Sequence, residues 1–513
     1  MNEASVRKTK PGDTVMNRQG LGIKVIHWGL VSQALIALSL VAWEVVNGPA
    51  TFTLLQGIIG GLDLKFALRL DALSTVLFAM ISVLGAVISQ YSLRYLDGEP
   101  RQGYFYKNLL FTVLSVSLLV LSSNLVMFFV AWCLSSAGLH NLLLFYRERP
   151  AAVLAARKKM LISRLGDFFL LAGFIVTYKV FGSFDFDQIF ALGADQGFGN
   201  ANSSMISVAG VFLVLGAIAK SAQFPLHFWL PETMETPTPV SALMHAGIIN
   251  AGGFLMIRMS PVLTHAELPH LLLTIAGAVT AVYGALVMIT QNDIKKKLAY
   301  STISQMGLMI FACGLGAYSI ALFHIIAHSF YKAYAFLSTG DLIIESKKSA
   351  LRPASFGLGY SLLATGLAIA VLAAGVNYQG GTHVAYFTYA GLLLIALMQC
   401  VVTLPAENFS RLRFYGSIAG LLALATAIYA VIETYVGSRM ATIVADTLDA
   451  TTLTSPTFIA SAVALVIFGT GFYLAGQIYN ADREWSRRLY MRLWNGDYFS
   501  QKSTHLLTAI WPA

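Results

Sequence analysis

The chain has 513 residues, of which 57% are hydrophobic and only 12% are charged. Soluble domains carry about 25% charged residues, so this composition excludes a large soluble enzyme and indicates a helical protein embedded in lipid. The net charge of +9 does not indicate a nucleic-acid partner, because the basic residues concentrate in loops between apolar segments. The cysteines Cys133, Cys313 and Cys400 are widely spaced inside apolar segments, so we expect neither disulfides nor a cysteine metal site.

About fourteen segments are long and apolar enough to cross a bilayer, since a span needs about 20 mostly apolar residues. They are, in chain order, 28–46, 72–91, 109–122, 124–146, 165–182, 204–222, 239–257, 271–289, 298–317, 319–338, 359–376, 386–402, 414–436 and 457–478. The preceding residues 1–24 are polar and basic, and they lack the apolar core of a removable signal peptide. Segment 49–70 is mixed and is expected to be a re-entrant or surface piece. The sequence thus predicts one all-α membrane domain over 1–513.

Basic residues sort by loop parity between these segments. The N-terminus, alternate loops and the C-terminal tail hold 27 of the 34 Lys and Arg residues, whereas the opposite loops hold four. Lys and Arg concentrate in cytoplasmic loops, so we expect both termini in the cytoplasm and a transmembrane bundle over 28–478. The tail 481–513 mixes arginines with tryptophans and tyrosines, which favours the membrane–water interface. We expect a surface-lying helix there, with a docking surface for a partner as the alternative.

Lys220, near the end of an apolar segment, is the first candidate site residue. A charge at mid-bilayer costs about 2.5–3.5 kcal/mol on insertion scales, so such residues persist mainly where they face a polar interior. Pro225 follows in the sequence; proline removes a backbone donor and breaks the helix, and broken helices at membrane depth line cavities. We expect Lys220 to exchange protons beside such a break. The alternative is a lysine that extends from a helix end to the interface.

Three further candidates lie in the run FHIIAHSFYKAYAF. His324, His328 and Lys332 are spaced i, i+4 and i+8, so they share one helix face, at about 6 Å per step. Such a ladder predicts a proton path once water connects its members, with an accidental cluster of core histidines as the alternative. The HxxxH spacing also occurs in zinc sites, but no glutamate lies between the histidines and no third ligand is evident, so we expect no metal.

His245 lies about two turns into a predicted span, and histidine titrates near neutral pH, which suits a relay. The alternative is a hydrogen-bonded packing residue. Four weaker relay candidates, for which an interface position or a structural ion pair is the favoured interpretation, are His140, Asp167, Glu232 and Glu235. Haem-binding CxxCH and Gly-rich nucleotide motifs are absent from the sequence, so it predicts neither electron transfer nor ATP hydrolysis within this chain.

The stretch AKSAQFPLHFWLPETMETPTPVSALMHA and the run NDIKKKLAYSTISQMGLMI resemble the signature region of antiporter-like membrane subunits. This superfamily includes the proton-pumping subunits of respiratory complex I and the Mrp cation/proton antiporters. The resemblance covers about residues 70–340 and implies a bundle with two inverted five-helix repeats, each with a broken helix. It matches Lys220 to the family's central broken-helix lysine, and His245 and the His/His/Lys ladder to positions of its proton relay.

Two features depart from the complex I pattern. Those subunits carry a Trp–Glu pair in an early helix, whereas here Cys133 follows Trp132. They also carry a lysine in the later broken helix, whereas residues 359–402 contain none. The runs AWCLSSAGLHNLLLFY, MHAGIINAGGFLMIRMSP and CGLGAYSIALFHIIAHSFYKAYAFLSTG instead resemble the DabB subunits of DAB inorganic-carbon uptake complexes.

The resemblance to DabB implies a non-enzymatic, ion-conducting subunit of the bacterial inner membrane. Its implied partner is a DabA-type protein, a large zinc protein similar to β-carbonic anhydrases, in a heterodimer or a larger assembly. Flow of H⁺ or Na⁺ through this chain is expected to energise one-way conversion of CO2 to bicarbonate on that partner, and no cofactor is expected in this chain. The alternatives are a complex I-like or Mrp subunit, and a scaffold that moves no ion. Buried titratable residues argue against the scaffold.

Overall fold

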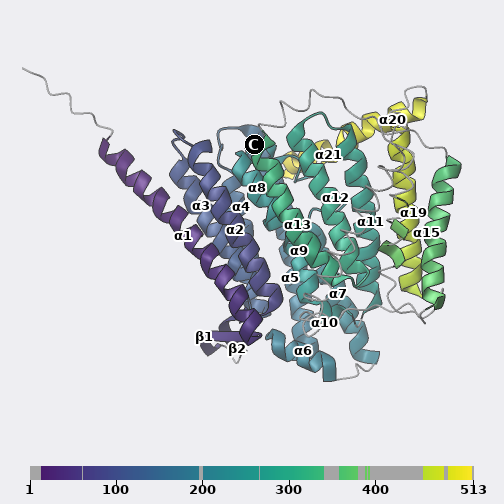
Figure 1. The fold of residues 1–513 in the computed structure, drawn as a ribbon, viewed down its shortest axis with the longest axis horizontal. Helices are drawn as coiled ribbons and strands as arrows, with labels where there is room; N and C mark the ends of the chain where they lie inside the picture. Colours follow the sequence, from purple (N-terminus) through teal and green to yellow (C-terminus); the bar gives the residue numbers. More distant parts are fainter. Residues whose placement is uncertain are drawn as a thin grey trace, which may run out of the picture.

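The computed structural model describes residues 13–59, 62–195, 200–264, 266–339, 358–378, 387–389, 391–392, 395, 455–478 and 483–510. Within these ranges the chain is a bundle of long helices with one β-hairpin (Figure 1). The first elements are α1 (Asp13–Asn47), β1 (Ala50–Ile59), β2 (Leu62–Leu70), α2 (Ala72–Tyr95), α3 (Gln102–Val120), α4 (Leu125–Leu143), α5 (Pro150–Phe181), α6 (Phe186–Asp195) and α7 (Asn200–Lys220). The central elements are η1 (Thr233–Glu235), α8 (Thr238–Ala246), η2 (Ile248–Asn250), α9 (Ala251–Arg258), α10 (Ser260–Leu263), α11 (Glu267–Thr290), α12 (Ile294–Gly314) and α13 (Tyr318–Leu337). The last are α15 (Leu358–Tyr378), α19 (Pro456–Gln477), α20 (Glu484–Trp494), η4 (Gly496–Tyr498) and α21 (Phe499–Ile510).

Ten helical stretches in the described part of the chain are long and apolar enough to cross a membrane. Apolar runs of this length form helices because a helix satisfies its own backbone hydrogen bonds in lipid. Two further predicted spans, 298–317 and 359–376, coincide with α12 and α15. The predicted spans 386–402 and 414–436 lie almost wholly outside the described residues. The total of about fourteen spans and the inverted repeats therefore stay predictions.

Residues 49–70 contain a β-hairpin, which departs from the all-α class predicted from composition. β1 pairs antiparallel with β2, from Ala50 opposite Leu70 to Ile59 opposite Leu62. Apolar and polar residues mix here without a continuous apolar run, so the segment suits a pleated, half-buried surface better than a membrane helix. The expectation of a piece that does not span agrees with this arrangement, although its strand geometry was not anticipated.

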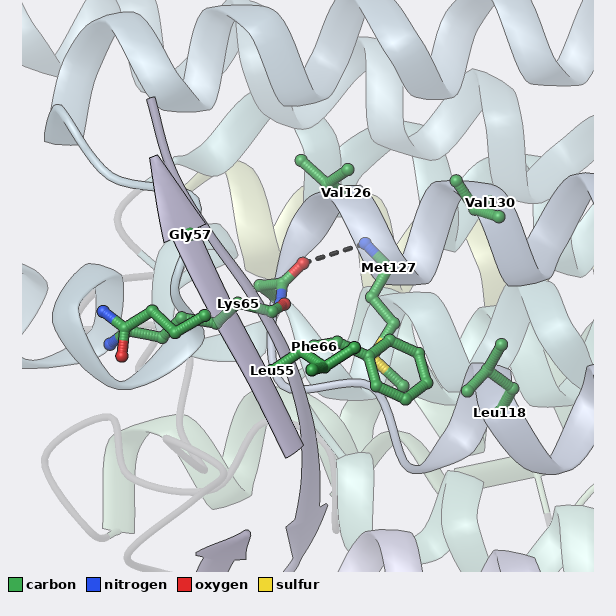
Figure 2. A pocket seen from close by; sticks show the side chains of 10 residues that line it. Leu55, Gly57, Lys65, Phe66, Leu118, Val126, Met127 and Val130 are labelled. Carbon is green, nitrogen blue, oxygen red and sulfur yellow. Dashed lines mark hydrogen bonds between the residues drawn. The ribbon is translucent and has the colours of Figure 1, made fainter. Parts of the chain in front are cut away.

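The hairpin is fixed to the turn between α3 and α4. The Asn124 side-chain amide donates to the backbone oxygen of Lys65 at 2.7 Å, and the backbone N–H of Arg69 donates to Leu121 at 2.8 Å. A pocket of about 410 Å³ lies between the hairpin and α4, with Met127 among its lining residues (Figure 2). The hairpin, α6 and α10 lie at one end of the bundle, and α20 and α21 lie at the opposite end (Figure 1).

A buried ion pair ties the end of α9 to the start of α2. Both side chains, Arg258 and Asp71, are 0% exposed, and the guanidinium donates to the carboxylate at 2.6 and 3.1 Å. Asp71 also caps α2 by accepting from the backbone N–H of Ser74 at 2.8 Å, and it accepts from Arg69 Nε at 2.5 Å. One carboxylate thus holds the end of β2, the start of α2 and the end of α9 together.

α5 begins at Pro150, so the helix starts well before the predicted span 165–182. Proline is favoured at the first helical position, and the alanines that follow are strong helix formers. The first turns of this helix bury Lys158 and Lys159, which are 2% and 3% exposed. The count of basic residues in alternate loops places both lysines in a loop instead. Their burial is tolerated because each amine finds a hydrogen-bond acceptor inside the bundle.

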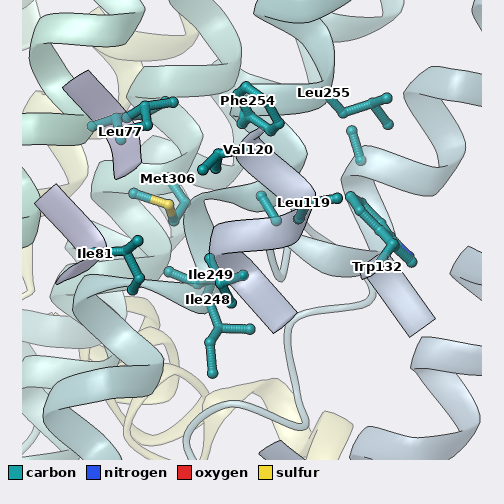
Figure 3. Packing of buried hydrophobic residues seen from close by; sticks show 14 of the residues in the cluster. Leu77, Ile81, Leu119, Val120, Trp132, Ile248, Ile249, Phe254, Leu255 and Met306 are labelled. Atoms are coloured by element: carbon teal, nitrogen blue, oxygen red, sulfur yellow. The ribbon is translucent and has the colours of Figure 1, made fainter. Parts of the chain in front are cut away.

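α8, η2 and α9 form one kinked crossing that is buried along its whole length. Helical bonding is interrupted at Ile248–Asn250, where Asn250 Nδ2 donates back to the Ala246 oxygen at 2.8 Å. Apolar side chains from several helices pack around the kink, among them Leu77 of α2, Trp132 of α4 and Met306 of α12 (Figure 3). This crossing carries His245 into the middle of the bundle.

Candidate functional site

Lys220 is the last residue of α7, and its side chain is directed into the bundle against α4. The residue is 7% exposed, so it does not extend to the interface. Its Nζ donates to Ser136 Oγ at 3.0 Å, to Ser135 Oγ at 3.2 Å and to the Trp132 oxygen at 3.3 Å. It also lies 4.4 Å from the centre of the Trp132 ring. The amine is therefore held by neutral dipoles and an aromatic face.

The helix ends beside this amine. α7 stops at Lys220, before Pro225, and the chain continues in turns until η1. Ser221 Oγ donates to the Ile249 oxygen at 2.7 Å, which joins this break to the kink of the central crossing. Asn250 in that kink donates to Ser329 Oγ of α13 at 2.8 Å. Hydrogen bonds thus join the end of α7 to the central crossing, and this crossing to α13.

Asp167 of α5 faces the same aromatic ring from its edge. The Trp132 indole N–H donates to Asp167 Oδ1 at 3.0 Å, and Arg164 Nη2 lies 2.7 Å from Oδ2. Asp167 and Lys220 interact electrostatically, with the indole between them. Asp167, a weaker candidate from sequence, therefore supplies the carboxylate near Lys220 that Cys133 cannot supply. Because Asp167 lies on α5 and Trp132 lies on α4, the residues next to Trp132 in the sequence do not indicate this contact.

Lys159 belongs to this cluster and was missed by sequence reasoning. Its Nζ donates to the backbone oxygen of Ser136 at 2.6 Å, and it interacts electrostatically with Lys220. His140, a weaker candidate, lies one helical turn beyond Ser136 on α4 and interacts with Lys159. Basic pairs such as Lys158 and Lys159 signal loops in topology counting, so only burial identifies this amine.

The ladder on α13 has the predicted arrangement. The rings of His324 and His328 stack with centroids 5.9 Å apart, His328 is 5% exposed, and Lys332 is fully buried. Lys332 Nζ donates to the Leu298 oxygen of α12 at 3.1 Å. The buried ring nitrogens of His328 bond to no protein group among the described residues. Because an unsatisfied buried polar atom costs about 1–3 kcal/mol, these nitrogens are suited to bonding water.

His245 joins the ladder from the central crossing. It is fully buried, its ring stacks on Phe336 at 4.5 Å, and it interacts electrostatically with Lys332 and His328. In the part of the chain that the structure describes, neither ring nitrogen bonds to a protein group. The structure thus brings His245, His328 and Lys332 together, while Lys220 lies in a separate cluster with Asp167 and Lys159.

Glu232 and Glu235 lie apart from both clusters, at the end of the bundle that carries α20 and α21. Glu232 accepts from Lys158 Nζ at 2.5 Å and from the Ser500 hydroxyl of α21. Glu235 pairs at 3.4 Å with Arg149, and both of these side chains are about half exposed. For these two residues the structural ion pair, the favoured alternative, describes the geometry.

His227 is a second buried residue that sequence reasoning missed. It lies in the turns after Lys220, is 1% exposed, and packs between the rings of Phe224, Tyr283 and Phe499. Phe499 belongs to α21, so the C-terminal helix covers this segment. Across the described ranges, no three His, Cys, Asp or Glu side chains converge in a way that suits a metal ion.

Comparisons with known proteins agree with this architecture. Residues 122–408 match the family described as NADH:quinone oxidoreductase/Mrp antiporter, transmembrane. Residues 57–106 match the N-terminal family of complex I chain 5. Two solved structures share the fold: the Mrp complex from Dietzia sp. DQ12-45-1b (TM-score 0.55, 21% identity, covering 96% of this chain and 57% of that one) and an archaeal membrane-bound sulfane sulfur reductase (TM-score 0.57, 18% identity, covering 90% and 94%).

Curated relatives specify the branch. The "Probable inorganic carbon transporter subunit DabB2" of Halothiobacillus neapolitanus is 36% identical over 458 residues, which cover 88% of this chain and 81% of the relative. The corresponding DabB of Hydrogenovibrio crunogenus is 32% identical over 86% and 82%. The NADH-ubiquinone oxidoreductase chain 5 of Metridium senile is 41% identical, but over only 54% and 46%. The chain therefore belongs to the DabB family, within the superfamily of antiporter-like membrane subunits of complex I and the Mrp complexes.

Proposed function

We propose that this chain conducts H⁺ or Na⁺ through the bacterial inner membrane and so energises inorganic-carbon uptake by a DabA-type partner. The relay comprises Lys220, His245, His324, His328 and Lys332. The observation that carries the proposal is the burial of Lys220, His245, His328 and Lys332 inside the bundle, where a fixed charge is costly and a passing proton is useful. Carbonic-anhydrase-like chemistry, and the zinc it needs, belong to the partner, in a heterodimer or a larger assembly.

The direction of the bundle in the membrane follows from charge. The start of α1, α20 and α21 lie at the same end of the bundle (Figure 1), and the N-terminus and the C-terminal tail are rich in Lys and Arg. We assign this end to the cytoplasm. The single membrane domain then has cytoplasmic residues 1–24, a transmembrane bundle over 28–478 and an interfacial tail over 481–513.

A proton-translocating subunit of a complex I-like or Mrp complex is the second candidate, because chain 5 relatives match over half of this chain. Cys133 in place of glutamate argues against it. In complex I-like subunits that glutamate pairs with the central lysine, whereas here, within the described residues, Lys220 contacts hydroxyl, carbonyl and aromatic groups. A proton path in which the carboxylate near the central lysine lies on a different helix fits a subunit whose ion flow drives a partner protein.

The relay is tested by replacing each lysine with methionine, which keeps the length of the side chain without its charge. We expect Lys220→Met and Lys332→Met each to lower ion flux, and the carbon uptake that depends on it, by about 100-fold, the scale of a lost proton-transfer group. Flux is measured with a pH-sensitive dye in vesicles that contain the complex, and uptake by growth in ambient air. Lys107→Met, at an exposed site on α3, is the control. Wild-type flux in both relay variants refutes the proposal.

A further inference from the structure

Two buried amines share one serine of α4. Lys159 Nζ, from α5, donates to the backbone oxygen of Ser136 at 2.6 Å, and Lys220 Nζ, from α7, lies 3.0 Å from the hydroxyl of the same residue. The two lysines are 3% and 7% exposed. Lys159 is not among the relay residues proposed above, and no carboxylate of the described residues forms an ion pair with it.

The charges around this pair do not balance when both amines are protonated. Among the described residues, Asp167 is the carboxylate that interacts with them, and it is already paired with Arg164 at 2.7 Å. Arginine stays protonated in proteins, so one carboxylate serves three cations. The remaining neighbours, Cys133 and His140, supply no negative charge while the thiol keeps its proton. Like charges repel strongly in a low-dielectric interior. In the favoured state, therefore, one of the two lysines is a charged ammonium and the other is a neutral amine.

The hydrogen bonds that Ser136 makes with the two amines can persist whichever amine carries the proton. A serine hydroxyl both donates and accepts hydrogen bonds, so Ser136 contacts Lys220 equally well as ammonium or as amine. The carbonyl that holds Lys159 also accepts from either form. In the transfer, the Lys159 ammonium loses a proton and the Lys220 amine gains it, so charge and atoms are conserved. Pairs coupled in this way titrate as a unit.

Lys159 lies between Lys220 and the end of the bundle that carries α20 and α21. Its neighbour Lys158 bonds to the backbone oxygen of Ser500 in α21 at 2.9 Å, so this part of α5 lies toward the end of the bundle that carries the C-terminal tail. His140 lies one turn from Ser136 on α4, and its side chain is only partly buried. His140, Lys159 and Lys220 thus follow one another from that end toward the interior.

We propose that Lys159 exchanges a proton with Lys220 beside Ser136 and so connects the central lysine to the α20–α21 end of the bundle. This inference rests on the proposed ion conduction, and it adds a proton-transfer residue to it. A merely structural lysine would need only its charge and its hydrogen bond to Ser136. Arginine supplies both but cannot release its proton, so it separates the two roles.

The test compares Lys159→Met, Lys159→Arg and Lys159→His in the full chain with its partner, using dye-reported proton flux in vesicles. We expect methionine and arginine each to lower flux by about 100-fold, and histidine, which releases protons near neutral pH, to restore part of it. Lys107→Met is again the control, and recovery of the assembled complex verifies folding. If methionine disrupts folding, the arginine and histidine variants decide.

Wild-type flux in Lys159→Arg overturns the transfer role, and so does wild-type flux in a folded Lys159→Met. Lys220→Met is measured in parallel to keep the two proposals apart. Loss of flux in Lys220→Met together with full flux in Lys159→Arg refutes only the role of Lys159. Full flux in Lys220→Met refutes the relay itself.

Discussion

Asp71 connects three parts of the fold through one carboxylate outside the membrane-spanning helices. Burial alone would raise the pKa of this carboxyl, but attraction to Arg258 and then to Arg69 holds the pKa well below its usual range. Since the pKa in the folded chain lies below the unfolded value of about 3.9, the stabilisation is fully present above that pH. It is lost as the pH falls through the folded-state pKa.

We expect Asp71→Asn to lower the free energy of unfolding by about 3–5 kcal/mol, because it leaves the fully buried Arg258 without its counter-charge. The measurement is the thermal unfolding midpoint in detergent. Asp187→Asn is the matched control, since this aspartate also pairs with Arg69 but its side chain is 57% exposed, where an ion pair contributes about 0–1 kcal/mol. Equal midpoints for wild type and Asp71→Asn at neutral pH contradict the expectation. The difference between them should shrink only below about pH 4.

At the residue scale, the spacing of residues within one helix predicted which candidate site residues lie together, whereas contacts between helices were not predicted. The i, i+4, i+8 pattern of His324, His328 and Lys332 was enough to place them on one face, because helix geometry fixes that relation. Sequence reasoning missed Lys159 because it stands in a basic stretch before the predicted span 165–182, and such a stretch indicates a loop whether its lysines are solvated or buried. The approach of Asp167 to Trp132 depends on two helices packing together, which no local pattern records.

Close packing of α11 against α12 positions one end of the proposed relay. A Cβ on Gly307 of α12 would meet the backbone of Ala281 and lie 2.8 Å from the Gly277 oxygen of α11. Small residues let membrane helices approach in this way. α12 also carries the Leu298 oxygen that accepts from Lys332, so the separation of these two helices sets the surroundings of that amine.

We expect Gly307→Val to force α11 and α12 apart and to lower the free energy of unfolding by about 1–3 kcal/mol, the usual cost of overpacking. Ion flux should fall as well, because the acceptor of Lys332 moves with α12. Unfolding midpoint and dye-reported flux are the two measurements. Gly366→Val, in α15 where nothing lies within 4 Å of the added Cβ, should leave both near wild type. An unchanged midpoint in Gly307→Val means that the contact is not tight.

At the element scale, long apolar runs predicted most of the described helices because lipid leaves the backbone few alternatives. The hairpin at 49–70 was recognised only as a segment that does not span, since its pairing depends on contacts with Asn124 and Leu121 far along the chain. The start of α5 was placed too late because its first turns carry basic residues. The predicted element boundaries differ from the structure where the polar groups of a segment bond to distant parts of the chain.

At the scale of the whole molecule, the C-terminal tail covers the segment that follows Lys220. Phe499 packs against Phe224 and His227 at 5.4 Å between ring centres, and Lys158 bonds to both Glu232 and Ser500. The tail is therefore part of the end of the bundle at which Lys159 and His140 lie. A soluble partner that uses the ion flow from that end would meet α20 and α21 first.

The partner bound by this chain can be identified by co-purification. Purification of the tagged chain from its native membrane should recover a large zinc-containing soluble subunit, because the chain belongs to the DabB family and the proposed function assigns carbonic-anhydrase-like chemistry to the partner. Zinc is measured by elemental analysis and the partner by mass spectrometry. Lys220→Met should recover the same subunit, since the role proposed for Lys220 lies in conduction and not in assembly. Recovery of quinone-reducing subunits or of other Mrp chains instead would assign the chain to the second candidate function.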